Sequence, residues 1–198
     1  MMSKKKNIGL YFGTFNPIHI GHLIIANHLA EFTDMDEVWL VITPHNPFKK
    51  SSNLLADYHR YQMVEMALGP YDNIKPSKVE FDLPRPNYTS KTLVKLEEDH
   101  KKSSFNLIIG EDNLINFKKW KNYDFILKNY GLYVCPRVSR SDFPEEFKNH
   151  RNIHWTKTPI MEISSTYIRY CVKEDKNYKP LLPKEVWNYI DEMNFYKK

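Results

Sequence analysis

The chain of 198 residues lacks any apolar run that approaches the ~20 residues needed to cross a bilayer. Residues 1–6 are polar and contain no apolar signal core. Only two cysteines are present, Cys135 and Cys171, and their spacing is not that of a disulfide framework, which indicates a reducing compartment. Internal repeats and low-complexity tracts are absent too. We therefore expect a cytoplasmic protein that does not associate with a membrane.

The charge and the aromatic content of the chain do not decide whether it binds small molecules or nucleic acid. The formal net charge is +5 and the lysines are scattered, which suits anionic small substrates as well as nucleic acid. Aromatic residues make up 14% of the chain, yet they form no regular stacking stripe of the kind that binds single strands. The length and the 41% hydrophobic content suit one domain over residues 1–198, with a C-terminal helical portion from about residue 164.

Strand-like and helix-like segments alternate along the chain. Short apolar runs predict strands, and apolar residues at helical spacing predict the helices between them. The expected strands are residues 8–12, 37–42, 74–81, 105–109 and 131–135, and helices are expected after residue 22 and near residues 57–68, 90–100 and 124–128. This order predicts an α/β protein with a Rossmann-like, doubly wound parallel sheet and helices on both faces. The polar segment 138–151 is expected to be a solvated loop or irregular surface segment.

A run from residue 13 to residue 22 reads Gly-Thr-Phe-Asn-Pro-Ile-His-Ile-Gly-His and lies where the first strand gives way to the first helix. Unpaired backbone N–H groups and the helix dipole favour an anion at such a helix start. The imidazoles of His19 and His22 can donate hydrogen bonds to phosphate oxygens, while Gly13 and Gly21 keep the backbone accessible. The segment therefore predicts a polyphosphate site.

Two simpler interpretations of the histidine pair compete with this one. A His-x-x-His spacing is common by chance, and such a pair is more often structural than functional. Zinc would need two further ligands, and Cys135 and Cys171 are far apart in otherwise apolar surroundings. The complete strand–loop–helix constellation favours the phosphate interpretation over both, and no protein metal site is predicted.

A second anion-binding segment lies near the C-terminus, where residues 163–169 read Ile-Ser-Ser-Thr-Tyr-Ile-Arg. Ser164 and Ser165 place hydroxyls at an expected helix start, and Arg169 follows about one turn later. Taken alone, either serine is an ordinary N-cap and the arginine is a surface charge. Together with the early histidines they would supply hydroxyl donors and a permanent cation to the far side of a triphosphate.

Taken in order, these motifs resemble the bacterial nicotinate-nucleotide adenylyltransferase family, within the nucleotidyltransferases that carry a His-x-Gly-His signature. The resemblance covers nearly the whole chain and includes Ile-Ile-Gly-Glu-Asp at residues 108–112. The remaining matches are residues 14–22, the proline-containing loop through Lys49, Arg60 and Met63, Tyr88-Thr89, Thr92-Leu93, Trp120, residues 163–169, Leu182-Pro183 and Tyr189-Ile190.

The resemblance implies transfer of AMP from ATP to nicotinate mononucleotide, giving deamido-NAD and pyrophosphate in NAD biosynthesis. Such a transfer depends on positioning and charge neutralisation, so no side-chain nucleophile is needed. The resemblance implies His19, His22 and Arg169 as catalytic residues, and Mg²⁺ as a cofactor that arrives with ATP. The implied ATP-binding residues are Gly13, Thr14, Phe15, His19, His22, Gly110, Asp112, Ser164, Ser165 and Arg169.

Nicotinate mononucleotide is assigned a second set of residues. Trp120 offers a flat face on which a pyridine ring can stack, and Thr89 can hydrogen-bond the ring carboxylate. Asn46 and Lys49 are plausible contacts for its phosphate or ribose. Each has a simpler alternative: a structural aromatic for Trp120 and a solvated loop lysine for Lys49. Asp112, named above among the ATP-binding residues, is expected to contact the adenosine ribose or to organise its loop, and a helix N-cap is its structural alternative.

The chain departs from the family pattern at a few positions. Phe12 stands where the family has a glycine, and Asn16 stands where it has an aspartate. Near residues 46–49 the loop is one residue shorter, and Phe48 replaces a histidine that could donate a hydrogen bond.

Two rival functions remain at this stage. A pantetheine-phosphate adenylyltransferase would share the phosphate motif but would not need Tyr88-Thr89 or Trp120. A nucleotide-binding or RNA-binding protein on the same fold is suggested only by the basic charge and the aromatics, and we expect no nucleic-acid partner. ATP and nicotinate mononucleotide are the expected partners, and formation of a homo-oligomer is left open.

Overall fold

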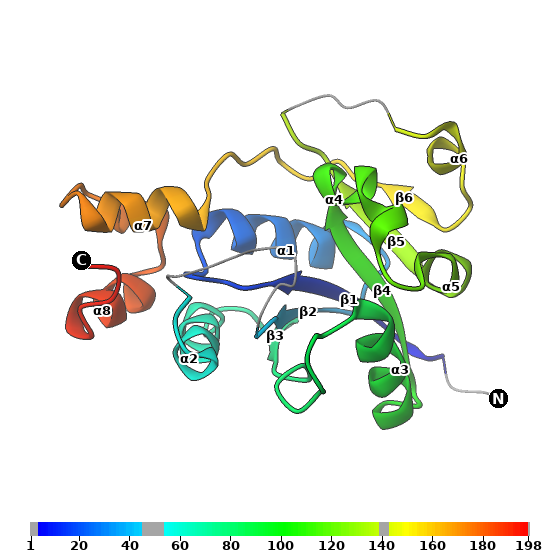
Figure 1. Ribbon diagram of the computed structural model, residues 1–198, viewed down its shortest axis with the longest axis horizontal. Helices are drawn as coiled ribbons and strands as arrows, with labels where there is room; N and C mark the ends of the chain where they lie inside the picture. The colour runs from blue at the N-terminus through cyan, green and yellow to red at the C-terminus, as the bar shows by residue number, and fades with distance from the viewer. Residues whose placement is uncertain (1–3, 45–53, 139–142, 198) are drawn as a thin grey trace.

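The computed structural model describes residues 4–44, 54–138 and 143–197. Within these residues a six-stranded sheet has the order β3-β2-β1-β4-β5-β6, and every neighbouring pair is parallel. The strands are β1 (Lys6–Gly13), β2 (Glu37–Ile42), β3 (Ile74–Ser77), β4 (Ser103–Gly110), β5 (Gly131–Cys135) and β6 (Ile153–Trp155). This order is that of a doubly wound Rossmann-like sheet, so the predicted fold class is confirmed (Figure 1).

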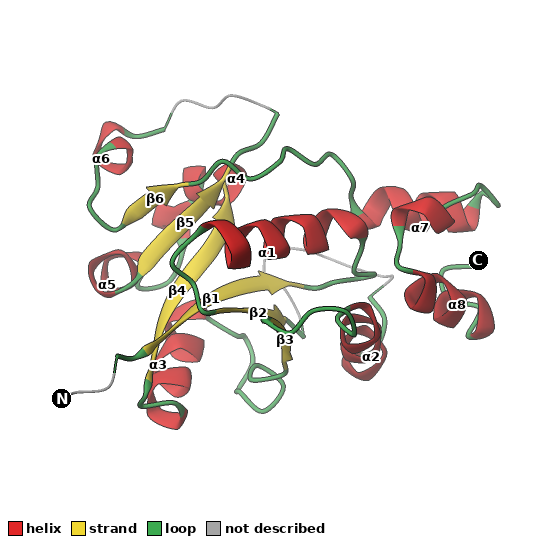
Figure 2. Ribbon diagram, turned by 180° about the vertical axis from the view of Figure 1, so that it is seen from behind, coloured by secondary structure: helices red, strands yellow, loops and turns green. Residues whose placement is uncertain are grey.

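Helices cover both faces of the sheet, as Figures 1 and 2 show from opposite sides. One buried core joins the sheet to α1 (Ile20–Phe32), α2 (Asp57–Ala67), α7 (Ser165–Lys173) and α8 (Lys184–Glu192). The other core joins it to α3 (Thr89–Asp99), α4 (Glu111–Ile115), η1 (Phe117–Lys119), α5 (Tyr123–Asn129) and α6 (Glu145–Lys148). The 3₁₀ turn η2 (Lys179–Leu181) connects α7 to α8.

Side chains alternate between the two faces of each strand, and this alternation explains why there are two cores. In β2 the side chains of Val38, Leu40 and Ile42 enter the core that contains α1, while Val41 enters the core that contains α3. Successive side chains of a strand point to opposite faces, so a strand buried on both faces is apolar throughout. This is why the sequence predicted β2 over its full observed length.

The edges of the sheet were predicted less well. The expected strand 74–81 ends at Ser77, and its Pro76 has no N–H to donate, which suits an edge strand. The expected loop 138–151 includes α6, whose Phe147 is 1% exposed, and β6 follows it without having been predicted. Both misses are short elements that are held by tertiary packing and have little periodicity of their own.

The C-terminal helices α7 and α8 lie at the end of the sheet away from the N-terminus, and α8 packs against α2 (Figure 1). The Tyr189 hydroxyl of α8 lies 2.9 Å from Nδ1 of His59 in α2. The Tyr196 hydroxyl donates to Oδ1 of Asn16 at 2.8 Å. The last helices thereby support the loop that follows β1. No helix in the described part of the chain is both long and apolar enough to span a membrane.

Candidate active site

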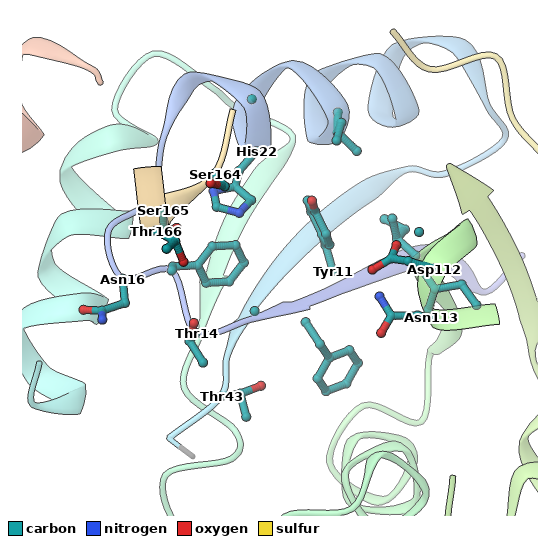
Figure 3. A pocket seen from close by; sticks show the side chains of 18 of the residues that line it. Tyr11, Thr14, Asn16, His22, Thr43, Asp112, Asn113, Ser164, Ser165 and Thr166 are labelled. Atoms are coloured by element: carbon teal, nitrogen blue, oxygen red, sulfur yellow. The ribbon is translucent and has the colours of Figure 1, made fainter. Parts of the chain in front are cut away.

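A cavity of about 1240 Å³ opens beyond the carboxyl ends of the central strands. The strand order reverses between β1 and β4, and ligands of open α/β sheets bind in the crevice at that point. The lining of the cavity includes residues from the loops after β1 and β4 and from the start of α7. In Figure 3, His22 lies beside Ser164, and Asp112 and Asn113 face them from the far side. The volume exceeds the ~300–1,000 Å³ of most small-ligand pockets, which leaves room for two nucleotides.

The two histidines of the N-terminal motif form a stacked pair. Their ring centroids are 3.6 Å apart and the rings are inclined by 23°. His19 is the N-cap residue of α1, and its backbone N–H donates to Nδ1 of His22 at 3.3 Å. Because this nitrogen of His22 accepts, a neutral His22 carries its proton on Nε2. Nδ1 of His19 is buried without a hydrogen-bond partner among the described residues, which marks a place for a ligand oxygen or a water.

Both imidazoles are held in the neutral form. Burial, and then the charge of Arg137, lower the pKa of His19 to about 4. Burial, the neighbouring His19 and Arg137 hold the pKa of His22 well below its usual value. At neutral pH these rings therefore act as hydrogen-bond donors, and the positive charge comes from elsewhere.

The two glycines of the motif make room for side chains of the motif itself. A Cβ on Gly21 would lie 3.1 Å from Nδ1 of His19, so any larger residue would press on that ring. A Cβ on Gly13 would lie 2.8 Å from the ring of Phe15. Gly21 therefore keeps space beside the histidines as expected, whereas Gly13 serves mainly to seat an aromatic ring.

Phe15 has a side chain that is 1% exposed and a backbone φ of 44°. Its ring packs edge-on against His22, with centroids 5.0 Å apart, and against Tyr11, at 6.0 Å. The Phe15 side chain supports the histidine from the core, so any contact with a ligand falls to its backbone. Thr14 also lines the cavity.

The C-terminal motif docks directly onto the N-terminal motif. Ser165 Oγ donates to the carbonyl of Pro17 at 2.8 Å, and Arg169 Nη1 donates to the carbonyl of Asn16 at 2.7 Å. Ser164 is the N-cap of α7, and its Oγ accepts from the N–H of Tyr167 at 3.2 Å. Ser164, Ser165 and Arg169 all line the same cavity as the histidines. Segments nearly the length of the chain apart thus converge on one site.

The opposite end of the cavity follows β4 and β5. Asp112 is the second residue of α4, which has Gly110 as its N-cap, so Asp112 is not the N-cap of that helix. Its Oδ1 accepts from Nε of Arg137 at 3.2 Å. A Cβ on Gly110 would overlap the Asp112 carboxylate and lie 2.9 Å from Arg137 Nε. Sequence reasoning missed Arg137, because a single arginine after an apolar strand carries no pattern of its own.

The third group of predicted residues lies around the start of α3. Thr89 is its first residue, and Trp120 packs against Phe117 with ring centroids 5.3 Å apart. Lys121 Nζ lies 4.6 Å from the centroid of the Tyr88 ring. All but Phe117 line the cavity. Asn46, Lys49 and Phe48, with the shortened loop around them, lie outside the described residues.

A buried polar cluster beside α3 was also missed. Glu80, 2% exposed, accepts a hydrogen bond from Thr92 Oγ1 at 2.7 Å, and its backbone carbonyl accepts from Asn87 Nδ2 at 3.0 Å. Burial raises the pKa of the Glu80 carboxyl. Glu80 and Asn87 both line the cavity. Their contacts are between residues that no local sequence pattern connects.

No three His, Cys, Asp or Glu side chains of the described segments come together as a metal site. The acidic residues that line the cavity are Asp112, which is paired with Arg137, Glu80, which accepts from Thr92, and Glu162. This donor set fits a cation that brings phosphate and water ligands of its own better than one held by a protein cage.

The fold and the site define a nucleotide-binding α/β protein of the kind that transfers nucleotidyl groups. A model of the cytidylyltransferase-like family matches residues 10–170, and the chain belongs to that family. It is 58% identical to a protein of Flavobacterium johnsoniae, over 96% of this chain and 99% of that one. It is 57% identical to a protein of Flavobacterium psychrophilum, with the same coverage. Both relatives carry the name "Probable nicotinate-nucleotide adenylyltransferase".

Solved structures support the fold. The nicotinic acid mononucleotide adenylyltransferase of Plasmodium falciparum, complexed with NaAD, superimposes with a TM-score of 0.79 at 18% identity. The alignment covers 96% of this chain and 97% of that one. At this identity the likeness establishes the shared architecture, and the relatives above place the chain among the nicotinate-nucleotide adenylyltransferases.

Proposed function

We propose that this protein transfers AMP from ATP to nicotinate mononucleotide, giving deamido-NAD and pyrophosphate. One observation carries the proposal: residues 13–22 and 163–169, remote in sequence, converge on a single cavity at the switch point of the sheet. Relatives at 57% and 58% identity share the name of this activity. The enzyme would act in NAD biosynthesis in the cytoplasm, with these two nucleotides as partners.

The triphosphate of ATP would lie between the two motifs. Nε2–H of His22 and the N–H groups at the start of α1, which have no partner within the helix, would donate to its oxygens. His19 would help to stabilise the negative charge that grows on the leaving pyrophosphate. Ser164, Ser165 and Arg169 would hold the β- and γ-phosphates from the other side. Oriented donors of this kind stabilise the transition state without having to reorganise.

The chemical step is an in-line displacement. An oxygen of the mononucleotide phosphate attacks the α-phosphorus of ATP, and the bond to the bridging oxygen of pyrophosphate breaks. No residue needs to form a covalent intermediate, so the enzyme contributes orientation and charge neutralisation. Mg²⁺ would arrive with ATP and neutralise phosphate charge, bound by phosphate oxygens and water. The adenosine would lie toward Gly110 and Asp112.

Nicotinate mononucleotide would bind toward α3 and Trp120. Thr89, at the first position of α3, offers a hydroxyl and a helix N-terminus to the ring carboxylate. The indole of Trp120 offers a stacking face on the cavity wall. Asn46 and Lys49 are proposed for its phosphate or ribose. A carboxamide in place of the carboxylate would lose the interaction with the helix N-terminus, so we expect a preference for the acid.

Pyrophosphate release tests the assignment. The purified protein is mixed with ATP and Mg²⁺ and with one of three acceptors: nicotinate mononucleotide, nicotinamide mononucleotide or phosphopantetheine. We expect release with nicotinate mononucleotide, at a kcat/KM at least about tenfold above that with the amide, the effect of one charge-assisted contact. Release with phosphopantetheine alone would contradict the proposal. Salt-sensitive RNA binding without any pyrophosphate release would contradict it as well.

A further inference from the structure

Arg60 is the largest fully buried side chain of the described residues, although it is charged. It lies in α2 with 0% exposure and is not part of the cavity lining. Taking a guanidinium out of water is costly unless every donor finds a partner. A buried guanidinium whose donors are all satisfied can fix backbone segments relative to one another, which an apolar side chain cannot do.

All five N–H donors of Arg60 have an acceptor, and four of these acceptors are backbone carbonyls. Nη1 donates to Thr14 O at 2.6 Å and to Thr43 O at 2.9 Å. Nη2 donates to Pro44 O at 3.1 Å and to Asp57 Oδ1 at 2.5 Å. Nε donates to Leu55 O at 3.0 Å. The single guanidinium therefore joins three separate stretches of backbone.

Two of these stretches line the cavity proposed for the two substrates. Thr14 follows β1 in the motif proposed for ATP, and Thr43, which precedes Pro44 in the loop after β2, lines the same cavity. The same loops are linked once more, because the N–H of Thr43 donates to the carbonyl of Gly13 at 2.8 Å. Arg60 is hydrogen-bonded to both sides of this junction but does not itself line the cavity.

We propose that Arg60 is a positioning residue that fixes the phosphate-binding loop after β1 relative to the loop after β2. The two reacting phosphates are thereby brought into line. This inference rests on the proposed function, since it assigns one substrate to each loop. Arg60 acts entirely through the carbonyls of Thr14, Thr43 and Pro44 and touches neither substrate. An error of about 1 Å in such an alignment can lower turnover by about 10²-fold.

Lysine cannot replace Arg60 in this role. A guanidinium presents five donors in a planar fork, whereas an ammonium presents three donors from one atom. Arg60→Lys keeps the charge and most of the side-chain volume but cannot reach all four carbonyls. It therefore separates the geometry of the fork from the simple presence of a buried cation.

The matched control is Arg85→Lys. Arg85 donates to the other carboxylate oxygen of Asp57, Oδ2, at 3.0 Å, but its side chain is 61% exposed and makes none of the hydrogen bonds to Thr14, Thr43 and Pro44 that Arg60 makes. For wild type and both variants, circular dichroism and thermal unfolding give the folded fraction. Steady-state kinetics give kcat and KM for each substrate, and amide hydrogen exchange reports on residues 13–16 and on Thr43, whose N–H donates to the carbonyl of Gly13.

The expected result for Arg60→Lys is a folded protein whose kcat falls about 100-fold. KM for each substrate should stay within about threefold, since neither substrate touches Arg60. Exchange at the Thr43 amide should become faster, which is a readout independent of activity. Arg85→Lys should match wild type in all three measurements.

A folded Arg60→Lys with wild-type kcat overturns the proposal, as does a loss of rate explained by the unfolded fraction alone. If Arg60→Lys does not fold, Asp57→Asn decides the matter, because it weakens the contact that orients the guanidinium, and Arg85→Lys controls for the contact of Asp57 with Arg85 that is weakened as well. It should lower kcat at least about fivefold with KM unchanged, and an unchanged kcat overturns the proposal. If the wild-type protein releases no pyrophosphate, that result contradicts the proposed function and not the role of Arg60. The rate of amide hydrogen exchange at Thr43 in Arg60→Lys then tests the positioning role without any measurement of activity.

Discussion

The two ends of the cavity hold their polar groups in opposite ways. At the end formed by β1 and α7, His19 is 4% exposed and neutral, and Arg169 is tied to a backbone carbonyl. At the end formed by β4 and β5, Asp112 and Arg137 form an ion pair with side chains 61% and 35% exposed. The first end is fixed before any ligand arrives, and the second can be rearranged by solvent or ligand.

This difference fits the two parts of an ATP molecule. Charge develops at the phosphates during the reaction, and donors there help most when they are rigid and shielded from water. The adenosine does not change during the transfer, so its site needs only affinity. We therefore expect substitutions at the first end to lower kcat and substitutions at the second end to raise KM.

The largest expected effect is that of His19→Ala. Removing one donor that stabilises a transition state lowers kcat by about 10²–10³-fold, and we expect the same here. The fold should remain, because the hydrogen bond from the His19 backbone N–H to Nδ1 of His22 at the start of α1 does not need the His19 side chain. Steady-state kinetics with circular dichroism check this. A kcat at the wild-type level would remove His19 from the mechanism.

Next in size is a loss of stability in acid. The pKa of His19 is about 4 in the folded protein and 6.5 in the unfolded chain, so the folded protein binds fewer protons between these values. The stabilisation is complete above pH 6.5 and is lost as the pH falls toward 4. The free energy of unfolding should fall by about 2–3 kcal/mol for this group.

Urea unfolding at pH 7 and pH 4.5 measures this loss, with His19→Ala as the comparison. The variant should lose less free energy of unfolding than wild type on acidification. Glu80 contributes with the opposite sign, because burial raises the pKa of its carboxyl and its stabilisation is lost as the pH rises. Glu80→Gln should therefore show a larger loss in acid than wild type. Equal losses in wild type and His19→Ala would contradict the assignment.

A smaller effect is expected for Gly21→Ala. Its Cβ would lie 3.1 Å from Nδ1 of His19, so the ring must shift by a few tenths of an ångström. We expect kcat to fall by about tenfold, because a catalytic donor is displaced without being removed. Gly69→Ala is the control, since a Cβ there would meet only the carbonyl of Met66 at 3.8 Å. Equal kcat values for the two variants would show that the stacked histidines tolerate movement.

The smallest effect is expected for Arg137→Gln at the exposed end. An exposed ion pair contributes about 0–1 kcal/mol to stability, so the melting temperature should hardly change. KM for ATP should rise by about three- to tenfold with kcat nearly unchanged, as for an interaction made equally in ground and transition states. Initial-rate kinetics at varied ATP check this. A large fall in kcat would abolish the contrast between the two ends.

The strands and helices of the core could be predicted from the sequence wherever the hydrophobic pattern was strong. β2 and β5 were predicted with their observed bounds, because each is a short apolar run between polar segments. β6 and α6 were missed, because three and four residues are too few to show a period. The two motifs proposed for phosphate binding could be recognised for a different reason: each is contiguous and lies at a helix start.

The sequence by itself determined the alternation of strands and helices, the two motifs proposed for anion binding and the family resemblance, because all of these are encoded in neighbouring residues. Only the tertiary structure decided how those motifs meet. Ser165 reaches Pro17 across 148 positions, and Arg60 reaches Thr14 across 46. It also decided that His19 and His22 are neutral, since burial and the charge of Arg137 set their pKa values. Burial and long-range contact depend on packing, and no local pattern of residues specifies them.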